Sequence, residues 1–457
     1  MSDANPVQPS LVRTEVRVTG ALAAVLAARM LGLFLLLPVF AVLGRDLPGA
    51  TPVLVGLAIG IYGLFQALLQ VPFGALSDRV GRKPVIVGGL LLFLVGSLLA
   101  AMAETIYGVI AGRALQGSGA IAAVVMALAA DVVSERHRTR VMAVLGLAIG
   151  GSFVLSLILG PWLGQQLGLS GLFYLCAVLV LVALVVAWLA VPSPRVRSCV
   201  ELPLPEQLAS VLRNAVLLRL DFGIFALHLV LTAIFVVVPV LLTEELGMPM
   251  ERHSLLYLGV LVAGFIAMVP LILLSERRGM RPVKVLAVAL LALSLMALAM
   301  ADAVLWQVVA ALFLFFTAFN LLEALLPSLV SRAAPAGARG SALGVYSSCQ
   351  FLGVFTGGLA GGLVLEYGGP EAVFWLAAAL SLLWLPVAAG MRELPRLDNR
   401  VLYLESGGME SDEWNRRLLA VEGVLEAVVV REEGVAMLKV DPARLDEQAL
   451  EHLGRAS

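Results

Sequence analysis

Long apolar runs alternate with short charged stretches along most of this chain. Apolar runs of roughly 20 residues fit bilayer-spanning helices, which satisfy their backbone hydrogen bonds internally where lipid offers none. The pattern predicts an all-α membrane protein with twelve transmembrane helices, in an N-terminal half (18–191) and a C-terminal half (215–391) of six helices each. The runs are Val18–Leu43, Leu54–Ala75, Val85–Ala103, Tyr107–Val133, Val141–Leu167, Leu172–Ala190, Arg219–Leu242, Ser254–Leu274, Val285–Ala301, Val304–Ser331, Ala342–Leu365 and Ala372–Met391.

Lys and Arg residues gather in alternate loops, on the side that also holds the N-terminal segment (1–17) and the central linker (192–214). The opposite side carries little beyond Arg45 and Arg252. Short cytoplasmic loops are enriched in Lys and Arg. We therefore expect a multi-pass protein of the inner (plasma) membrane with both termini and the linker in the cytoplasm. The basic residues of that side are Arg13, Arg17, Arg79, Arg82, Lys83, Arg136, Arg138, Arg140, Arg195, Arg197, Arg213, Arg277, Arg278, Arg281, Lys284, Arg332 and Arg339.

The last stretch, 396–457, changes to a charged, soluble composition. Its pattern predicts the order β-α-β-β-α, which is most of a split βαβ, ferredoxin-like domain whose final strand is missing or lies past the end. The predicted elements are the strands Val401–Glu405, Val424–Arg431 and Val435–Val440 and the helices Ser411–Val421 and Pro442–Leu453. The sequence thus predicts a small α+β cytoplasmic domain after the membrane helices.

The overall composition agrees with lipid as the main solvent. The 457 residues are 60% hydrophobic and 14% charged, with a mean hydropathy of +0.98, whereas soluble proteins average about 45–50% apolar and about 25% charged. The net charge of −1 gives no basic face for nucleic acid. Cys176, Cys199 and Cys349 lie far apart and suggest neither disulfides nor a metal cluster. No G-x-x-x-x-G-K-[ST] motif is present, so we expect no ATP-driven pump, no enzyme and no cofactor.

One ten-residue phrase is nearly repeated. LSDRVGRKPV occupies 76–85 and LSERRGMRPV occupies 274–283, an offset of 274 − 76 = 198 residues. Each copy lies between two apolar runs, and Asp78 and Lys83 are answered by Glu276 and Arg281. The repeat predicts two homologous halves, each with a charged hairpin between two membrane helices.

Three motifs carry a family resemblance. GALSDRVGRKP (74–84), RALQGSGA (113–120) and SLILGPWLGQ (156–165) resemble the hairpin, fourth-helix and fifth-helix motifs of the major facilitator superfamily. The fifth-helix motif departs from the antiporter pattern at Ser156 and Gln165, where glycine is usual. RMLGLFLLLPVF (29–40), FNLLEALLPSLVSR (319–332) and the tail domain resemble more narrowly the YajR-type branch, drug-efflux-like permeases with a ferredoxin-like YAM domain. The resemblance implies a transporter that works by alternating access of its two halves.

The resemblance also implies a conformational latch at the hairpin. Asp78 would meet the N-terminus of the eleventh helix near Gly340–Ser341, where the helix dipole favours negative charge, and Arg82 would pair with Asp131. The alternative is that the basic residues only keep the loop in the cytoplasm. The candidate latch residues are Gly74, Asp78, Arg79, Gly81, Arg82, Lys83 and Asp131, with Glu276, Arg277 and Arg281 as a weaker second-half latch.

Helix five carries Gly160, Pro161 and Gly164 with further glycines before them. Small residues allow close helix packing in membranes. The motif predicts either packing alone or a gating hinge at the proline.

Polar residues within the spans are the candidates for the proton and substrate cavity, because ionisable groups in the bilayer are costly and usually functional. Glu323 is the main candidate for proton or substrate binding, and the alternative is a static ion pair with Arg29. Asp221 is equally compatible with a helix cap, and His228 with simple packing. The set is Arg29, Arg113, Asp221, His228, Asn320 and Glu323, with Gln66, Gln70, Gln116 and Gln350 as further candidate linings.

These observations favour a secondary transporter, with small-molecule substrates and protons as its ligands and the lipid bilayer as its surroundings. Proton-coupled efflux is the leading hypothesis; a membrane sensor with a transporter-like core, or an uncoupled facilitator, is the alternative. The tail lacks the M-x-C-x-x-C motif of heavy-metal domains, since its first loop is Ser406–Glu410. We therefore expect the tail to dimerise or to bind a regulatory ligand.

Overall fold

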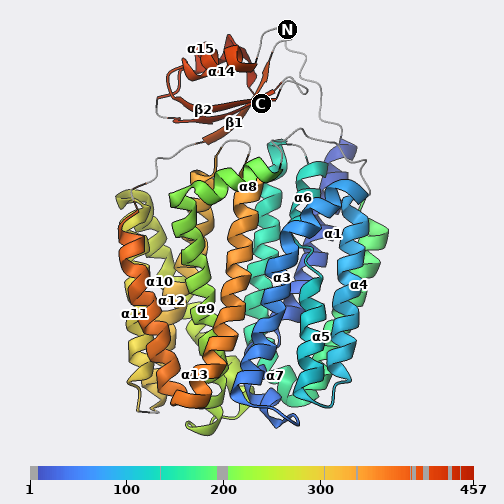
Figure 1. Ribbon diagram of the computed structural model, residues 1–457, viewed down its shortest axis with the longest axis vertical. Coiled ribbons are helices and arrows are strands. Elements are labelled where there is room, and N and C mark those ends of the chain that lie inside the picture. The colour runs from blue at the N-terminus through green and yellow to red at the C-terminus, as the bar shows by residue number, and fades with distance from the viewer. Residues whose placement is uncertain are drawn as a thin grey trace.

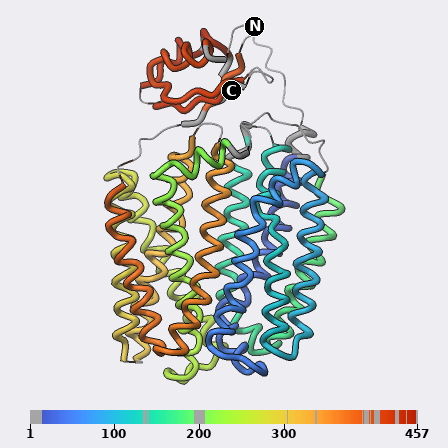
Figure 2. The backbone as a smooth tube through the Cα atoms, in the orientation of Figure 1, coloured from blue at the N-terminus to red at the C-terminus, as the bar shows by residue number. Residues whose placement is uncertain are grey.

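The computed structural model describes residues 9–133, 135–192, 204–302, 304–335, 338–391, 393, 398–404, 411–430, 435–442 and 444–456. It shows an elongated bundle of helices with a small sheet-containing unit at one end (Figures 1 and 2). We call the end of the bundle beside that unit the tail end, and the opposite end the far end. Most of the central linker, 193–203, lies outside the described residues, as do Cys199 and the basic residues 195 and 197.

The bundle consists of two groups of helices that lie side by side (Figure 1). Ten of its helical segments are long and apolar enough to cross a membrane. The N-terminal group is α1 (Pro9–Phe34), α2 (Phe40–Leu43), η1 (Gly44–Asp46), α3 (Pro52–Val80), α4 (Arg82–Ala101), α5 (Ile106–Ser118), α6 (Ala122–Val132) and α7 (Glu135–Ala190). The C-terminal group is α8 (Leu204–Arg213), α9 (Ala215–Glu244), α10 (Met250–Arg278), α11 (Met280–Ala299), α12 (Leu305–Ala333) and α13 (Arg339–Ala389).

Several predicted spans have breaks that hydropathy does not show. The first run ends as regular helix at Phe34, and Pro38, which has no N–H to donate, lies in the turn before α2. The fourth run is divided between α5 and α6. Conversely, α7 and α13 each join two predicted runs through a single non-helical glycine, Gly168 (φ 64°) and Gly369 (φ 79°). Positive φ is accessible to glycine at little steric cost, so these helices reverse without a long loop.

The two groups meet mainly along α3 and α13 and along α7 and α10. Glycines allow α3 and α13 to approach closely toward the far end: a Cβ on Gly60 would lie 2.7 Å from the carbonyl oxygen of Phe355, and Gly56 lies against the backbone of Gly358. Toward the tail end the same helices diverge (Figure 1). A hydrogen bond from Gln70 to Ser347 (2.8 Å) still joins them partway along. The contact between α3 and α13 is therefore closest toward the far end.

The C-terminal unit (398–456) contains β1 (Asp398–Leu404), α14 (Ser411–Leu419), β2 (Val424–Val430), β3 (Val435–Val440), α15 (Glu447–Glu451) and β4 (Gly454–Ala456). Its strands form one antiparallel sheet in the order β2-β3-β1-β4. The prediction that the last strand is missing was wrong: Gly454–Ala456 pairs with β1. The strand was overlooked because three residues leave no readable alternation of apolar and polar positions.

One buried lysine ties this unit to the membrane helices. Lys439 on β3 is 5% exposed, and its ammonium donates a 2.9 Å hydrogen bond to the carbonyl of Ala334, the residue that ends α12. A cation at a helix C-terminus is favourable because the last carbonyls carry partial negative charge. The sheet therefore rests on the C-terminal group of helices.

Candidate functional site

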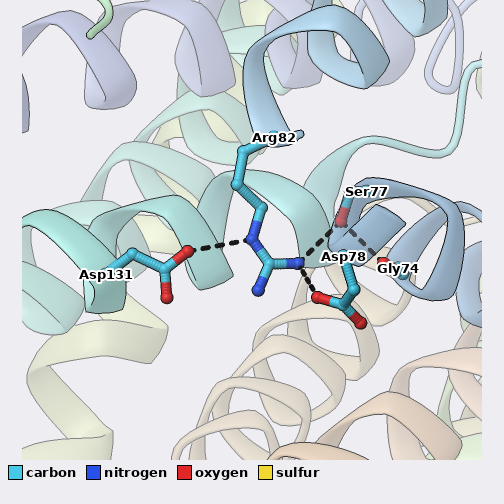
Figure 3. A network of polar contacts seen from close by, with 5 residues as sticks. All are labelled: Gly74, Ser77, Asp78, Arg82 and Asp131. Atoms are coloured by element: carbon cyan, nitrogen blue, oxygen red, sulfur yellow. Dashed lines mark hydrogen bonds and ion pairs between the residues drawn. The ribbon is translucent and has the colours of Figure 1, made fainter. Parts of the chain in front are cut away.

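The hairpin between α3 and α4 brings three of the predicted latch residues together (Figure 3). Gly81 makes the turn with φ 97°, a conformation that side-chain-bearing residues rarely adopt. Arg82 begins α4, and its guanidinium binds Asp131 at the end of α6 (Nε–Oδ2, 2.9 Å) and forms an ion pair with Asp78. It also donates to the hydroxyl of Ser77 (2.7 Å). One arginine thus bridges two carboxylates on two helices.

The other predicted contact of the latch is not made in this conformation. Within the described residues, Asp78 pairs with Arg82 and is 58% exposed rather than bound at α13. At the start of α13, Ser341 instead donates a 2.7 Å hydrogen bond to Gln207 of α8. A Cβ added to Gly340 would meet nothing within 4 Å. The N-terminus of α13 and the hairpin are therefore apart.

The remaining basic residues of the two hairpins differ in their roles. Lys83 donates to the carbonyls of Trp188 and Val191 at the end of α7, both at 2.8 Å. Arg281, its counterpart 198 residues on, donates to the carbonyl of Ala389 at the end of α13 (2.6 and 3.0 Å). Each therefore caps the last helix of its own half, where a cation is favourable. Arg79 and Arg277 are exposed.

The predicted pair of Glu276 and Arg281 is not what positions Arg281. Met280 stands where the first hairpin has Arg82, so the side chain at that position carries no charge. The backbone N–H groups of Met280 and Arg281 are instead bound by Glu393 (2.7 and 3.1 Å). The second hairpin is thus tied to the chain that leads into the C-terminal unit.

A buried polar network fills the centre of the N-terminal half. Arg29 is fully buried, and its Nη2 donates to Tyr62 (2.7 Å), Gln66 (2.7 Å) and the carbonyl of Gly119 (2.9 Å). Its Nε and Nη1 have no hydrogen-bond partner among the described residues. Its guanidinium also lies 5.9 Å from the ring centres of Tyr62 and Phe93, whose faces attract a cation.

The network extends sideways through Arg113 and toward the other half through two glutamines. Arg113 donates to the carbonyls of Ala58 and Ile59 and to Gln116 (3.2, 3.3 and 3.0 Å). Gln66 donates to Gln70 (2.9 Å), and Gln70 donates to Ser347 of α13 (2.8 Å). The last bond crosses between the halves.

The C-terminal half has acidic residues at the corresponding depth. His228 on α9 accepts from Gln350 (2.8 Å) and lies 3.9 Å from a carboxylate oxygen of Glu323 on α12. Asp221 is 4% exposed, and neither of its oxygens has a partner among the described residues. The amide nitrogen of Asn320, also largely buried, is likewise unsatisfied. The structure thus places His228 near Glu323. Asn320 lies three residues before Glu323, so these two residues share one face of α12.

Arg29 and Glu323 do not form the predicted ion pair. Among the described residues Arg29 has no carboxylate partner, since its bonds run to its own half, and Glu323 faces His228 instead. Hydropathy alone could not reveal this, because it does not say which helix face each residue occupies.

The helix-five motif packs closely, as its small residues predict. A Cβ on Gly160 would lie 2.8 Å from the carbonyl of Leu35 and from the ring of Pro38, and one on Gly164 would lie 3.2 Å from Val39. Pro161 lies within α7. The motif therefore seats the fifth span against the break in the first.

Sequence reasoning overlooked Tyr62, Ser347 and the buried hydroxyl of Tyr346, which has no hydrogen-bond partner among the described residues. Tyr62 had a usable signal, because Tyr62, Gln66 and Gln70 recur every four residues and so share one helix face. Among the described residues no group of three or more His, Cys, Asp or Glu could hold a metal ion.

Ten apolar helices in two groups, with the buried arginines Arg29 and Arg113 in one group and the buried acid Asp221 in the other, define a multi-pass membrane protein with a polar centre. Comparisons with known proteins agree. The family model of the Major Facilitator Superfamily matches residues 22–358 and 220–408. The chain therefore belongs to the Major Facilitator Superfamily, and it is a membrane transporter of that type and not an enzyme.

Two relatives and one solved structure illustrate the match. The chain is 43% identical over 430 residues to the inner membrane transport protein YajR of Escherichia coli, covering 93% of this chain and 94% of that protein. It is 29% identical over 226 residues to the multidrug resistance protein MdtH of Yersinia pestis, covering 48% of this chain and 55% of that protein. The human organic anion transporter MFSD10 shares the fold, with a TM-score of 0.60 at 20% identity over 82% of this chain and 99% of that one.

Proposed function

We propose that the protein is a proton-coupled secondary transporter that exports small, partly apolar molecules by alternating access. The observation that carries this proposal is the separation of charge between the halves. Buried Arg29 and Arg113 belong to the N-terminal half. Asp221, which is buried, and Glu323, whose side chain is 38% exposed, belong to the C-terminal half. An acid without a cationic partner in the bilayer is best accommodated by binding a proton. Glu323 is the proton-coupling residue in this proposal, and Asp221 and His228 are the alternatives.

The tail end is the cytoplasmic side in this proposal. The charged hairpins, with Arg82, Lys83 and Arg281, lie there, and short cytoplasmic loops favour basic residues. Counting α5 with α6 as one span, and α7 and α13 as two spans each, gives twelve spans. Both termini and the C-terminal unit, whose element order is ferredoxin-like, are then cytoplasmic. The tail domain has a dimerising or ligand-binding role.

The conformation described here is then the cytoplasm-open form. Its halves are in close contact at Gly56 and Gly358 near the far end, whereas α3 and α13 diverge toward the tail end, beyond the hydrogen bond of Gln70 to Ser347 (Figure 1). Asp78 would reach the N-terminus of α13 only when the tail end closes. The hairpin latch thus stabilises the outward-open form, and its unengaged state here agrees with that role.

The test is transport by the purified protein in liposomes. A pH gradient is imposed across the liposome membrane, with the acidic side corresponding to the outside of the cell. An internal pH dye follows proton movement while hydrophobic organic cations and organic anions are added in turn. We expect at least one class to drive proton movement that stops when the gradient is collapsed by an ionophore. Substrate movement that ignores the gradient would instead establish an uncoupled facilitator.

A membrane sensor is the second candidate, because Lys439 and Glu393 attach the C-terminal unit to the ends of α12 and α11. Such contacts would transmit a change in the helices to the tail. Removal of residues after Met391 separates the two functions: a transporter continues to move its substrate, whereas a sensor loses its output.

A further inference from the structure

At the far end a carboxylate of one half binds the first turn of a helix of the other half. Glu366, in the first part of α13, accepts a 3.1 Å hydrogen bond from the backbone N–H of Val53 in α3. The other donors of that turn are accounted for. Pro52 has no N–H, and the N–H of Leu54 is bound by the N-cap residue Thr51 (3.3 Å). Glu366 therefore supplies from the opposite half the acceptor that this helix start lacks.

A second contact joins the halves at the same end. Arg45 of η1 forms an ion pair with Glu244 at the end of α9. Both residues are about half exposed, at 39% and 50%, so the pair alone contributes little. Together with Glu366, it shows that the far end is closed by charges as well as by glycine packing.

Glu366 repeats the local placement of Asp78 on the other side of the molecule. Asp78 lies three residues before Gly81 (φ 97°), and Glu366 lies three residues before Gly369 (φ 79°). Each acid thus occupies the last turn of its helix, just before the glycine at which the chain reverses. Helices α3 and α13 are antiparallel neighbours (Figure 1), so the end of each lies beside the start of the other.

We propose that Glu366 is an outer latch residue: it holds the far end closed while bound to the start of α3 and releases it when the transporter opens outward. This inference rests on the alternating access proposed above. Asp78 would act on the start of α13 in one state, and Glu366 acts on the start of α3 in the other. The two acids therefore oppose each other along the same pair of helices.

The physical basis is the short range of both interactions. The N-terminus of a helix carries partial positive charge that attracts a carboxylate, and the effect falls off within one turn. A hydrogen bond is lost once donor and acceptor separate beyond about 3.5 Å. A small rotation of the halves therefore breaks this contact completely, while the packed glycines set the position to which the halves return.

The test measures how far the far end opens. In a variant whose three cysteines are replaced by alanine, Glu104→Cys and Asp302→Cys place spin labels on exposed loops of the two halves at the far end. Electron spin resonance then gives the distance distribution in liposomes. We expect Glu366→Gln to raise the ratio of the long-distance, outward-open population to the short one roughly two- to fivefold, and Glu366→Ala to raise it at least as much. Glu371→Gln, an equal charge change on the same part of the surface, leaves the ratio unchanged.

A double variant separates the effect on the latch from a folding defect, because a folding defect would not restore the wild-type population. Asp78→Asn weakens the opposing latch and lowers the outward-open population, and adding Glu366→Gln returns it toward the wild-type value. If Glu366→Gln and Glu366→Ala match Glu371→Gln, the outer latch is wrong, even when Asp78→Asn shifts the populations. If the spin-label distance distribution has a single peak that is the same in wild type and in every variant, Asp78→Asn included, alternating access itself is wrong.

Discussion

The two charged hairpins of this protein share a shape but not a charge network. Both turn at a glycine with φ above 90°, Gly81 and Gly279. In both, the second residue after the glycine, Lys83 or Arg281, caps the last helix of its half. Only the first hairpin adds an arginine that bridges two carboxylates, because the second has methionine at that place.

The difference between the hairpins distinguishes residues that stabilise the fold from residues that we assign to the transport cycle. Capping by Lys83 and Arg281 occurs twice, so it belongs to the construction of a six-helix half. The cluster around Arg82 occurs once, so in the proposed cycle we assign it to the movement between halves. The charged groups in the middle of the spans also differ between the halves, with Arg29 and Arg113 in one half and Asp221 and Glu323 in the other. Buried Lys284 of the second half lies near the start of α11.

The largest expected effect tests the division of buried charge. Glu323→Gln imitates the protonated acid, so transport should lose its dependence on the proton gradient while substrate binding survives. The measurement compares uptake into liposomes with and without a pH gradient, and binding by thermal stabilisation. Binding and gradient dependence that are both unchanged would exclude Glu323 as the coupling residue and leave Asp221 or His228.

The next effect tests the hairpin that carries the cluster. Asp78→Asn keeps the size of the side chain and removes its charge, so transport should fall at least roughly fivefold, the low end of typical coupling between two states. Glu276→Gln is the matched change in the second hairpin and should have a much smaller effect. Equal transport by Asp78→Asn and wild type would reduce the hairpin to a topology signal. Comparable elution of both variants in gel filtration checks their folding.

Loss of the other carboxylate should be milder. Asp131→Asn leaves Arg82 with Asp78 as its remaining acid, and an exposed ion pair contributes roughly 0.2–1 kcal/mol. We expect initial transport rates reduced by less than those of Asp78→Asn. A defect as large as that of Asp78→Asn would show that the bridge, rather than Asp78 itself, is the latch.

The smallest expected effect concerns the helix capping that occurs in both halves. Lys83→Ala and Arg281→Ala each remove a helix cap worth roughly 0.3–1 kcal/mol, so both should lower the thermal unfolding midpoint slightly and by similar amounts. Transport per folded molecule should stay near that of wild type. A transport loss in only one of them would mean that this cap also takes part in the cycle.

Much of the fold could be predicted because lipid imposes simple rules on a chain. Runs of apolar residues located the membrane helices, and the repeated phrase located the two hairpins. The pair of Arg82 and Asp131 also follows from the family motif and is present in the structure. The reversals at Gly168 and Gly369 lie between predicted runs, as expected. The breaks inside the first and fourth runs, after Phe34 and after Ser118, were not predicted, since they leave the hydropathy of those runs unchanged.

The partners of buried residues were harder to predict. Arg29 binds Tyr62 and Gln66 rather than Glu323 because helix rotation, set by packing of neighbouring helices, decides which groups meet. Arg281 turns to Ala389 for the same reason. Sequence identifies a costly buried group, but the choice among several nearby partners depends on distances that only the assembled bundle fixes.

Within the described residues, the C-terminal unit is attached to only one of the two halves, so it would move together with that half. Lys439 binds the end of α12, and Glu393 binds the start of α11, so both ties run to the same half. When that half rotates relative to the other, the displacement of the C-terminal unit grows with its distance from the rotation axis. In the proposed alternating access, a fluorophore placed on α14 would therefore move farther than the ends of α11 and α12.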